Sequence, residues 1–169
     1  MIDEFWGYYQ QYYFEYIYHE FERARLKSIL RWTSVASYFV TAVSLATWGV
    51  TQRFAILWSP VIFFSQVVNN LKDQLSVNKR IWALDEYIGK SAVEIEKFAE
   101  GWRLIKLGRL TDTEILKRLN QSSAIFVDLD ITYIRPFGAR EYKRLIDKAN
   151  VRTNEALTMK HGKGEDYVK

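Results

Sequence analysis

The sequence predicts an all-helical membrane protein, in which a two-helix transmembrane hairpin is flanked by helical N- and C-terminal regions, and which assembles as an oligomer. Two long stretches carry no charged residue, an aromatic run precedes them, and helical periodicity follows them. We therefore expect an aromatic cytoplasmic or interfacial helix over 1–31, the hairpin over 32–71, a cytoplasmic helical region over 72–158 and a flexible tail over 159–169.

The hairpin is predicted from a gap in the charges. Residues 32–52 and 54–71 contain no Asp, Glu, Lys or Arg, and only Arg53 separates them. At 1.5 Å per residue the two helices would measure about 31 and 27 Å, close to the hydrocarbon core of a bilayer, about 30 Å thick. Soluble helices of this length usually carry charges on one face, so a membrane hairpin is favoured over a buried hairpin in a soluble bundle.

Lys and Arg residues give the expected orientation. They gather before the first span and after the second, whereas the connecting turn holds only Arg53. The flanking residues are Arg23, Arg25, Lys27 and Arg31 on one side and Lys72, Lys79 and Arg80 on the other. By the positive-inside rule both termini face the cytoplasm, and the chain is a multi-pass protein of the plasma membrane.

The aromatic run FWGYYQQYYFEYIYHEF occupies residues 5–21. In a helix its rings gather on one side, where Phe5, Tyr9, Tyr12, Tyr13 and Tyr16 lie together. Rings with polar tips suit the headgroup layer, so an interfacial helix is the first interpretation. A contact between subunits and base stacking on an oligonucleotide are the alternatives.

Polar side chains form a stripe along each predicted span. The first stripe contains Ser37, Thr41 and Ser44, and the second contains Ser59, Gln66 and Asn70, which Asp73 continues into the cytoplasm. Polar groups in hydrocarbon usually face protein or water, so these residues are predicted to line a pore in an oligomer, with four subunits as the expected number. Alternatively, the Ser and Thr hydroxyls bond to the backbone of their own helix.

The cytoplasmic region is predicted to be helical with one exception. Helical spacing continues from Leu71 to about Lys97, with a weak point at Gly89, and Thr111 with Glu114 forms a capping box that starts a helix over 112–120. Residues 124–134, AIFVDLDITYI, alternate as a strand would. A last helix is expected after Pro136-Phe137-Gly138.

Two basic clusters are candidate ligand sites. Arg140, Arg144, Lys148 and Arg152 are spaced four apart, and Arg103, Lys106 and Arg109 form a second cluster. Arg side chains match phosphate oxygens, and an oligomer would repeat each cluster around its axis, so we predict nucleotide binding there. A solvated helix face and attraction to anionic lipid remain alternatives.

Nothing in the sequence indicates an enzyme. The chain has no cysteine and only two histidines, His19 and His161, and it carries no phosphate-binding loop, zinc spacing or dinucleotide fingerprint. Asp128 and Asp130 without a nearby histidine are weak metal ligands. We therefore expect no catalytic residue, no metal and no cofactor.

The arrangement resembles the SLATT family of bacterial two-span membrane effectors. The resemblance rests on the lead-in, the hairpin at 32–71, the long helix after it and the closing segment RPFGAREYKRLIDKAN. It implies a pore-forming antiphage effector in the inner membrane, with an oligonucleotide or cyclic nucleotide from a partner nucleotidyltransferase as its signal. The alternatives are a holin-like or scaffolding membrane protein without a ligand, and a soluble helical adaptor.

Overall fold

The computed structural model describes residues 1–48, 77–138 and 141–161, with side chains of α1 placed as far as Phe39 and at Ala42. The α-helices are α1 (Ile2–Trp48), α3 (Val77–Lys106), α4 (Asp112–Leu129) and α5 (Lys143–His161). A π-helix, η2 (Asp130–Ile134), and a 3₁₀ turn, η3 (Arg135–Phe137), follow α4. Within the described residues every regular element is helical, which confirms the all-helical class.

The chain divides into two compact units. The first comprises Met1–Arg23 and Ala83–Lys169, and the second comprises Ala24–Trp82. Helix α1 contributes residues to both units and runs without a break from Ile2 to Trp48. The predicted boundary between residues 31 and 32 therefore lies inside one continuous helix.

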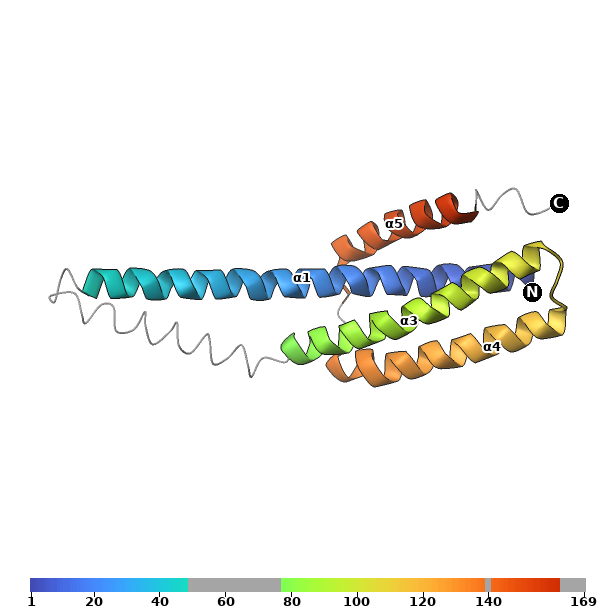
Figure 1. Cartoon of the computed structure of the whole chain (residues 1–169), viewed down its shortest axis with the longest axis horizontal. Helices are drawn as coiled ribbons and strands as arrows, with labels where there is room; N and C mark the ends of the chain where they lie inside the picture. The colour runs from blue at the N-terminus through green and yellow to red at the C-terminus, as the bar shows by residue number, and fades with distance from the viewer. Residues whose placement is uncertain (49–76, 139–140, 162–169) are drawn as a thin grey trace. The chain divides into compact units, whose positions relative to one another are not determined.

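The first unit packs helices against the beginning of α1. Figure 1 shows α5 along one side of this part of α1, and α3 and α4 along the other. Its core contains aromatic rings from all of α1, α3 and α4, together with aliphatic side chains from α3, α4 and α5. The core residues are Phe5, Tyr9, Tyr12, Ile95, Phe98, Trp102, Ile105, Ile115, Leu119, Phe126 and Leu157.

The aromatic run of α1 supplies one face of this core. Phe5, Tyr9 and Tyr12 are at most 6% exposed, and Tyr13 and Tyr16 are partly buried beside them. The predicted face is thus confirmed, and the rings on it pack against the chain's own helices. Tyr12 stacks on Phe126 of α4 with ring centroids 4.0 Å apart, an arrangement that aromatic pairs favour.

Tyrosine, rather than phenylalanine, suits this face because its hydroxyl groups reach partners at the edge of the core. The Tyr12 hydroxyl lies 2.8 Å from the Ser123 hydroxyl of α4, and the Tyr9 hydroxyl lies 3.3 Å from Nε2 of His161. Outside this face, the Tyr18 hydroxyl accepts a hydrogen bond from the backbone N–H of Tyr142 at 3.3 Å. These bonds fix α4 and α5 along α1, with α5 antiparallel to it.

A tight connection joins α3 to α4. Gly108 has a positive φ of 63°, and its N–H donates to the Ile105 carbonyl while the Arg109 N–H donates to that of Leu104. This is the glycine-dependent Schellman ending of a helix. Thr111 then caps α4, and its predicted capping box with Glu114 is confirmed. Helix α3 shows no break at Gly89, contrary to the weak point expected there.

The predicted strand over residues 124–134 is wrong, because this segment is helical. The buried residues Ile115, Leu119, Phe126 and Leu129 follow helical spacing, whereas Val127 and Ile131, which suggested the alternation, are each 49% exposed. Extending a helix already started by the capping box costs less than starting a new element. A strand without a neighbour would also leave its backbone groups unpaired.

The helix after α4 changes geometry before α5 begins. Residues Asp130–Ile134 adopt π-helical turns, and Pro136, which has no N–H to donate, falls in the 3₁₀ turn that ends the element. Asp130 accepts a hydrogen bond from Nε of Arg135 at 2.8 Å. Gly138, with φ of 73°, closes the turn. Helix α5 begins at Lys143, after Pro136-Phe137-Gly138 as predicted.

The second unit contains the later part of α1 and the first turns of α3. No helix among the described residues is both long enough and apolar enough to span a bilayer. Residues 49–71, most of the predicted hairpin, lie outside the described part. The hydroxyl groups of Thr33 and Ser34 donate to the carbonyl of Leu30 at 3.0 and 2.8 Å, which is the backbone bonding considered above for polar residues in a span.

Candidate ligand-binding groove

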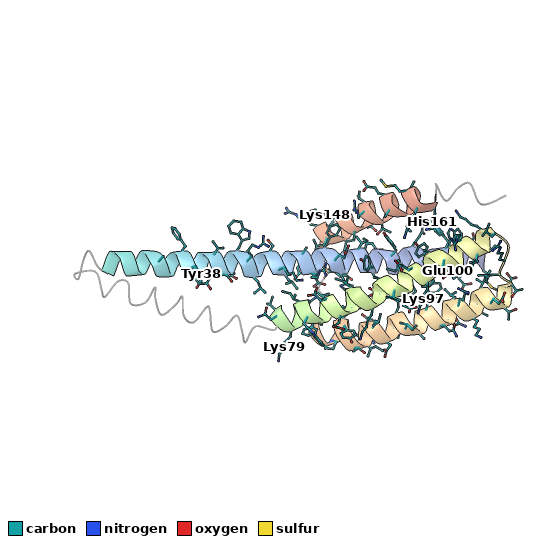
Figure 2. All side chains as sticks on the ribbon, in the orientation of Figure 1. Tyr38, Lys79, Lys97, Glu100, Lys148 and His161 are labelled. Atoms are coloured by element: carbon teal, nitrogen blue, oxygen red, sulfur yellow. The ribbon has the colours of Figure 1, made fainter. Side chains whose placement is uncertain are left out.

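A groove of about 750 Å³ lies within the first unit between α3 and α4, with Phe5 of α1 among its lining residues. Figure 2 labels Lys97 on α3, where that helix runs alongside α4. The lining residues are Phe5, Glu94, Lys97, Phe98, Leu110, Glu114, Lys117, Arg118, Gln121, Ser122, Ala124 and Ile125. The volume falls in the range of sites that hold small molecules, about 300–1,000 Å³.

Helical spacing places these side chains together. On α3, Glu94, Lys97 and Phe98 stand at positions i, i+3 and i+4, so they share one face. On α4, the lining residues from Glu114 to Ile125 recur every three or four positions. The Schellman ending of α3 turns the chain back, so the two faces oppose each other across the groove.

Glu94 is the unusual residue of the groove. Its side chain is 7% exposed, and Oε1 accepts a hydrogen bond from Nζ of Lys97 at 2.6 Å. Oε2 is buried and has no hydrogen-bond partner among the described residues. A buried carboxylate oxygen without a donor is costly, so such a group in a native protein calls for a partner.

Three cationic side chains also line the groove: Lys97, Lys117 and Arg118. Lys97 is 57% exposed even though it bonds to Glu94. Lys117 and Arg118 lie on the exposed surface of α4. They give the groove a positive rim opposite one buried carboxylate.

The Glu114 carboxylate takes part in the capping box that starts α4. Its Oε2 accepts hydrogen bonds from the backbone N–H and the hydroxyl of Thr111, both at 2.8 Å. The backbone bond, followed by the hydroxyl bond, lowers the pKa of Glu114. This carboxylate therefore stabilises α4. Glu94 differs from it because its second oxygen is buried without a hydrogen-bond donor among the described residues.

A second polar cluster lies further along α1. Glu22 is 2% exposed and lies 3.2 Å from Nδ1 of His19, whose ring packs edge-on against Tyr87. Arg23 donates to Asp85 of α3 at 2.9 Å. Burial raises the pKa of Tyr87, so its hydroxyl keeps its proton. These groups pair α1 with α3. Among residues 1–48, 77–138 and 141–161, no group of three or more acidic or histidine side chains is placed to hold a metal.

The structure places the predicted nucleotide-binding residues elsewhere. Arg144, Lys148 and Arg152 are exposed along α5, Arg103, Lys106 and Arg109 are exposed at the end of α3, and Arg140 lies outside the described residues. Because α5 is antiparallel to α1, Lys106 meets the far end of α5, where its Nζ donates to the carbonyl of His161 at 3.1 Å. Arg144 stands 17 residues earlier on the same helix, about 25 Å away along its axis.

The two predicted basic clusters therefore do not merge into one site within a single chain. Figure 2 labels Lys148 and His161 toward opposite ends of α5. None of the six described residues of these clusters is among those that line the groove. Their role in ligand binding stays a prediction.

Of the predicted pore-lining residues, only Ser37 has a described side chain, and it is 8% exposed. Thr41 and Ser44 belong to α1, but their side chains are outside the described set, and Ser59, Gln66, Asn70 and Asp73 lie wholly outside the described residues. The pore prediction therefore stays as the sequence made it.

Sequence reasoning missed the groove. Glu94, Lys117 and Arg118 stand in ordinary amphipathic helices, where charged residues are normally solvated. The capping box could have indicated the groove. It predicted a helix beginning at residue 112, and in such a helix Lys117, Arg118 and Gln121 lie on one face. The strand assigned to residues 124–134 obscured how far that face extends.

Comparison with family models, with curated proteins and with solved structures found no match to this chain.

Proposed function

We propose that this chain is a pore-forming membrane effector of bacterial antiphage defence, in which a helical cytoplasmic unit binds a nucleotide or oligonucleotide and sets the state of the pore. The pore is built by the two charge-free stretches at 32–52 and 54–71 in a homo-oligomer. The similarity of this layout to the SLATT effectors supports the biological role.

The observation that carries the proposal is the continuity of α1. One helix begins in the aromatic core of the first unit and continues through residue 48, well into the first charge-free stretch. Phe5, Tyr9 and Tyr12 hold its beginning against α3 and α4. A change in how these helices pack is thus linked by an unbroken backbone to the predicted first span.

A ligand can act on such a pore only if it binds one of two states more tightly than the other. The first unit offers a groove formed by three of the helices that would have to shift relative to one another. Binding there would favour the packing that best fits the ligand. Sensing is therefore the function that we assign to this unit.

Release of an entrapped dye from vesicles tests the pore. The purified full-length chain is reconstituted into vesicles of phosphatidylethanolamine and phosphatidylglycerol, and wild-type protein is expected to release the dye. Gln66→Leu should slow the release, because it removes a polar group from a narrow path, and Asp73→Lys should shift the preference from cations toward anions.

Gln10→Leu is the matched control, since Gln10 is exposed on the part of α1 that belongs to the first unit. It changes the same residue type and should leave release unaltered. Release that is indifferent to both Gln66→Leu and Asp73→Lys would show that the second polar stripe is packing rather than a pore lining. Vesicles that stay intact with the wild-type protein, with and without nucleotides, would rule out the pore itself.

A further inference from the structure

We propose that the groove between α3 and α4 is the ligand site of the protein, and that it takes a nucleotide whose base carries an amino group. The base donates to Glu94 Oε2, and the phosphates bind Lys117 and Arg118. This inference rests on the proposed function and deepens it, because it names the ligand class and places the site in the groove rather than on the basic stripe of α5.

The open oxygen of Glu94 defines one half of the ligand. The oxygen is buried, Glu94 is one of the residues that line the groove, and no described residue donates a hydrogen bond to this oxygen. An exocyclic amino group of a base meets that need, since an ionised carboxylate only accepts hydrogen bonds. The ring N–H of uracil lies between two carbonyl oxygens, which the carboxylate repels. Lys97 already neutralises the other oxygen at 2.6 Å, so a neutral donor is sufficient.

The positive rim defines the other half. Lys117 and Arg118 are consecutive, exposed residues of α4. The acidic residues of the lining are Glu94, which accepts from Lys97, and Glu114, which accepts from Thr111. Lys and Arg are the side chains that bind phosphate most effectively. Inorganic phosphate would bind these cations but leave Glu94 Oε2 without a donor, and a simple amine would do the reverse.

Part of the groove lining is apolar and aromatic. Phe5 and Phe98 line the groove with ring centroids 5.1 Å apart, and Leu110 and Ile125 add aliphatic surface. Phe5 and Phe98 are each only 1% exposed, so the flat ring of a base packs mainly on the accessible surface of Leu110 and Ile125. The volume of about 750 Å³ suits one nucleotide or the terminal nucleotide of a short chain.

Position within the unit links this site to the proposed function. Phe5 is 1% exposed and belongs to both the groove lining and the core that holds α1. Its ring tip lies 3.0 Å from where a Cβ at Gly101 would stand, so α1 and α3 approach closely at this point. A ligand bound beside Phe5 would therefore change how α1 packs against α3.

Binding is measured by calorimetry on the purified full-length chain in detergent at low salt, with ATP, GTP, CTP, UTP, adenosine and inorganic phosphate as separate probes. We expect ATP, GTP or CTP to bind more tightly than UTP, which lacks the amino group, and more tightly than adenosine or phosphate alone. Added salt should weaken binding, since it screens the phosphate contacts. No binding by any of the three amino-bearing nucleotides, or phosphate binding as tightly as they do, would overturn the proposal.

Glu94→Gln removes the charge but keeps the shape of the side chain, and it should weaken binding about tenfold, the effect of losing a charge-assisted hydrogen bond. Glu96→Gln is the control, because Glu96 lies two residues away on the exposed side of α3. Equal affinities for these two variants would remove Glu94 from the site. Thermal melting of each variant checks that the fold is retained.

Lys117→Glu should weaken binding more than Lys143→Glu, a charge reversal on the exposed surface of α5. If instead Arg144→Glu and Lys148→Glu abolish binding while Lys117→Glu does not, the ligand binds the α5 stripe and the groove assignment is wrong. Dye release separates this inference from the proposed function: nucleotide binding to Glu94 without any release would refute the pore and leave the groove assignment standing.

Discussion

Tyr9 illustrates how single residues determine the packing of the first unit. Its side chain has no exposed surface, and burial, with a smaller contribution from Tyr13, raises its pKa to about 12. The hydroxyl therefore keeps its proton and can donate to Nε2 of His161, 3.3 Å away. The His161 ring also meets Trp6 and Tyr9 edge-on. One histidine thus ties the end of α5 to the aromatic face of α1.

This contact predicts a dependence of stability on pH. Burial, then the positive charges of Lys106 and Lys160, lowers the pKa of His161 below its ordinary value of 6.5. The unfolded chain therefore takes up this proton at a higher pH than the folded chain does. Stability from this residue is complete above pH 6.5, falls as the pH drops below that value, and levels off below the folded-state pKa.

Melting temperatures of wild-type protein and of His161→Asn, measured across this pH range, check the prediction. The wild type should lose stability relative to the variant on acidification, because Asn does not titrate. Burial raises the pKa of Glu15, which acts in the opposite direction, but both proteins share that residue. Parallel melting curves for the two proteins would show that His161 is not held in its neutral form.

At the scale of elements, α4 shows that a helix-capping motif outweighs a short alternation of apolar and polar residues. The capping box at Thr111 and Glu114 predicted where the helix begins, and the structure confirms it. The alternation of Val127, Leu129 and Ile131 favoured a strand, yet only Leu129 of the three is buried. Alternation indicates a strand when a neighbouring strand is present to pair with it, and the described part of this chain has none.

The cap itself can be tested. Thr111→Ala should destabilise the protein by about 1 kcal/mol. The N–H of Glu114 loses its side-chain acceptor and keeps only the Thr111 carbonyl, and the Glu114 carboxylate loses the hydroxyl donor. For a chain of this size that destabilisation corresponds to a melting temperature lower by roughly 2–4 °C. Thermal denaturation followed by circular dichroism at 222 nm, the standard helix signal, measures it.

Thr113→Ala is the matched control, because Thr113 is an exposed threonine two residues further along the same helix. Alanine has the higher helix propensity, so this variant should be neutral or slightly stabilised. Thr111→Ser should keep most of the wild-type stability, since serine is an equally good cap. A Thr111→Ala protein as stable as wild type would show that the box contributes nothing to α4.

At the scale of the whole molecule, the proposed orientation places both termini in the cytoplasm. The chain has no cysteine, so single cysteines can be introduced at Gln10 and Lys160, which are both exposed. In intact cells an impermeant thiol reagent should label neither position, and after permeabilisation it should label both. A cysteine at Arg53, in the predicted outer turn, should be labelled in intact cells. Labelling of Gln10→Cys or Lys160→Cys from outside would contradict the orientation.

The sequence by itself determined the helical class, the aromatic face of α1 and the cap of α4, because each depends on residues within a few turns of one another. It also predicts the membrane hairpin, from charge-free length alone. Only the tertiary structure decided what the aromatic face packs against, since Phe126 lies more than a hundred residues from Tyr12. The groove, too, was decided only by the tertiary structure. Glu94 loses its solvent and its second hydrogen-bond partner only when α3 and α4 fold back on each other around Phe5, and no local pattern records which side chains such a fold will bury.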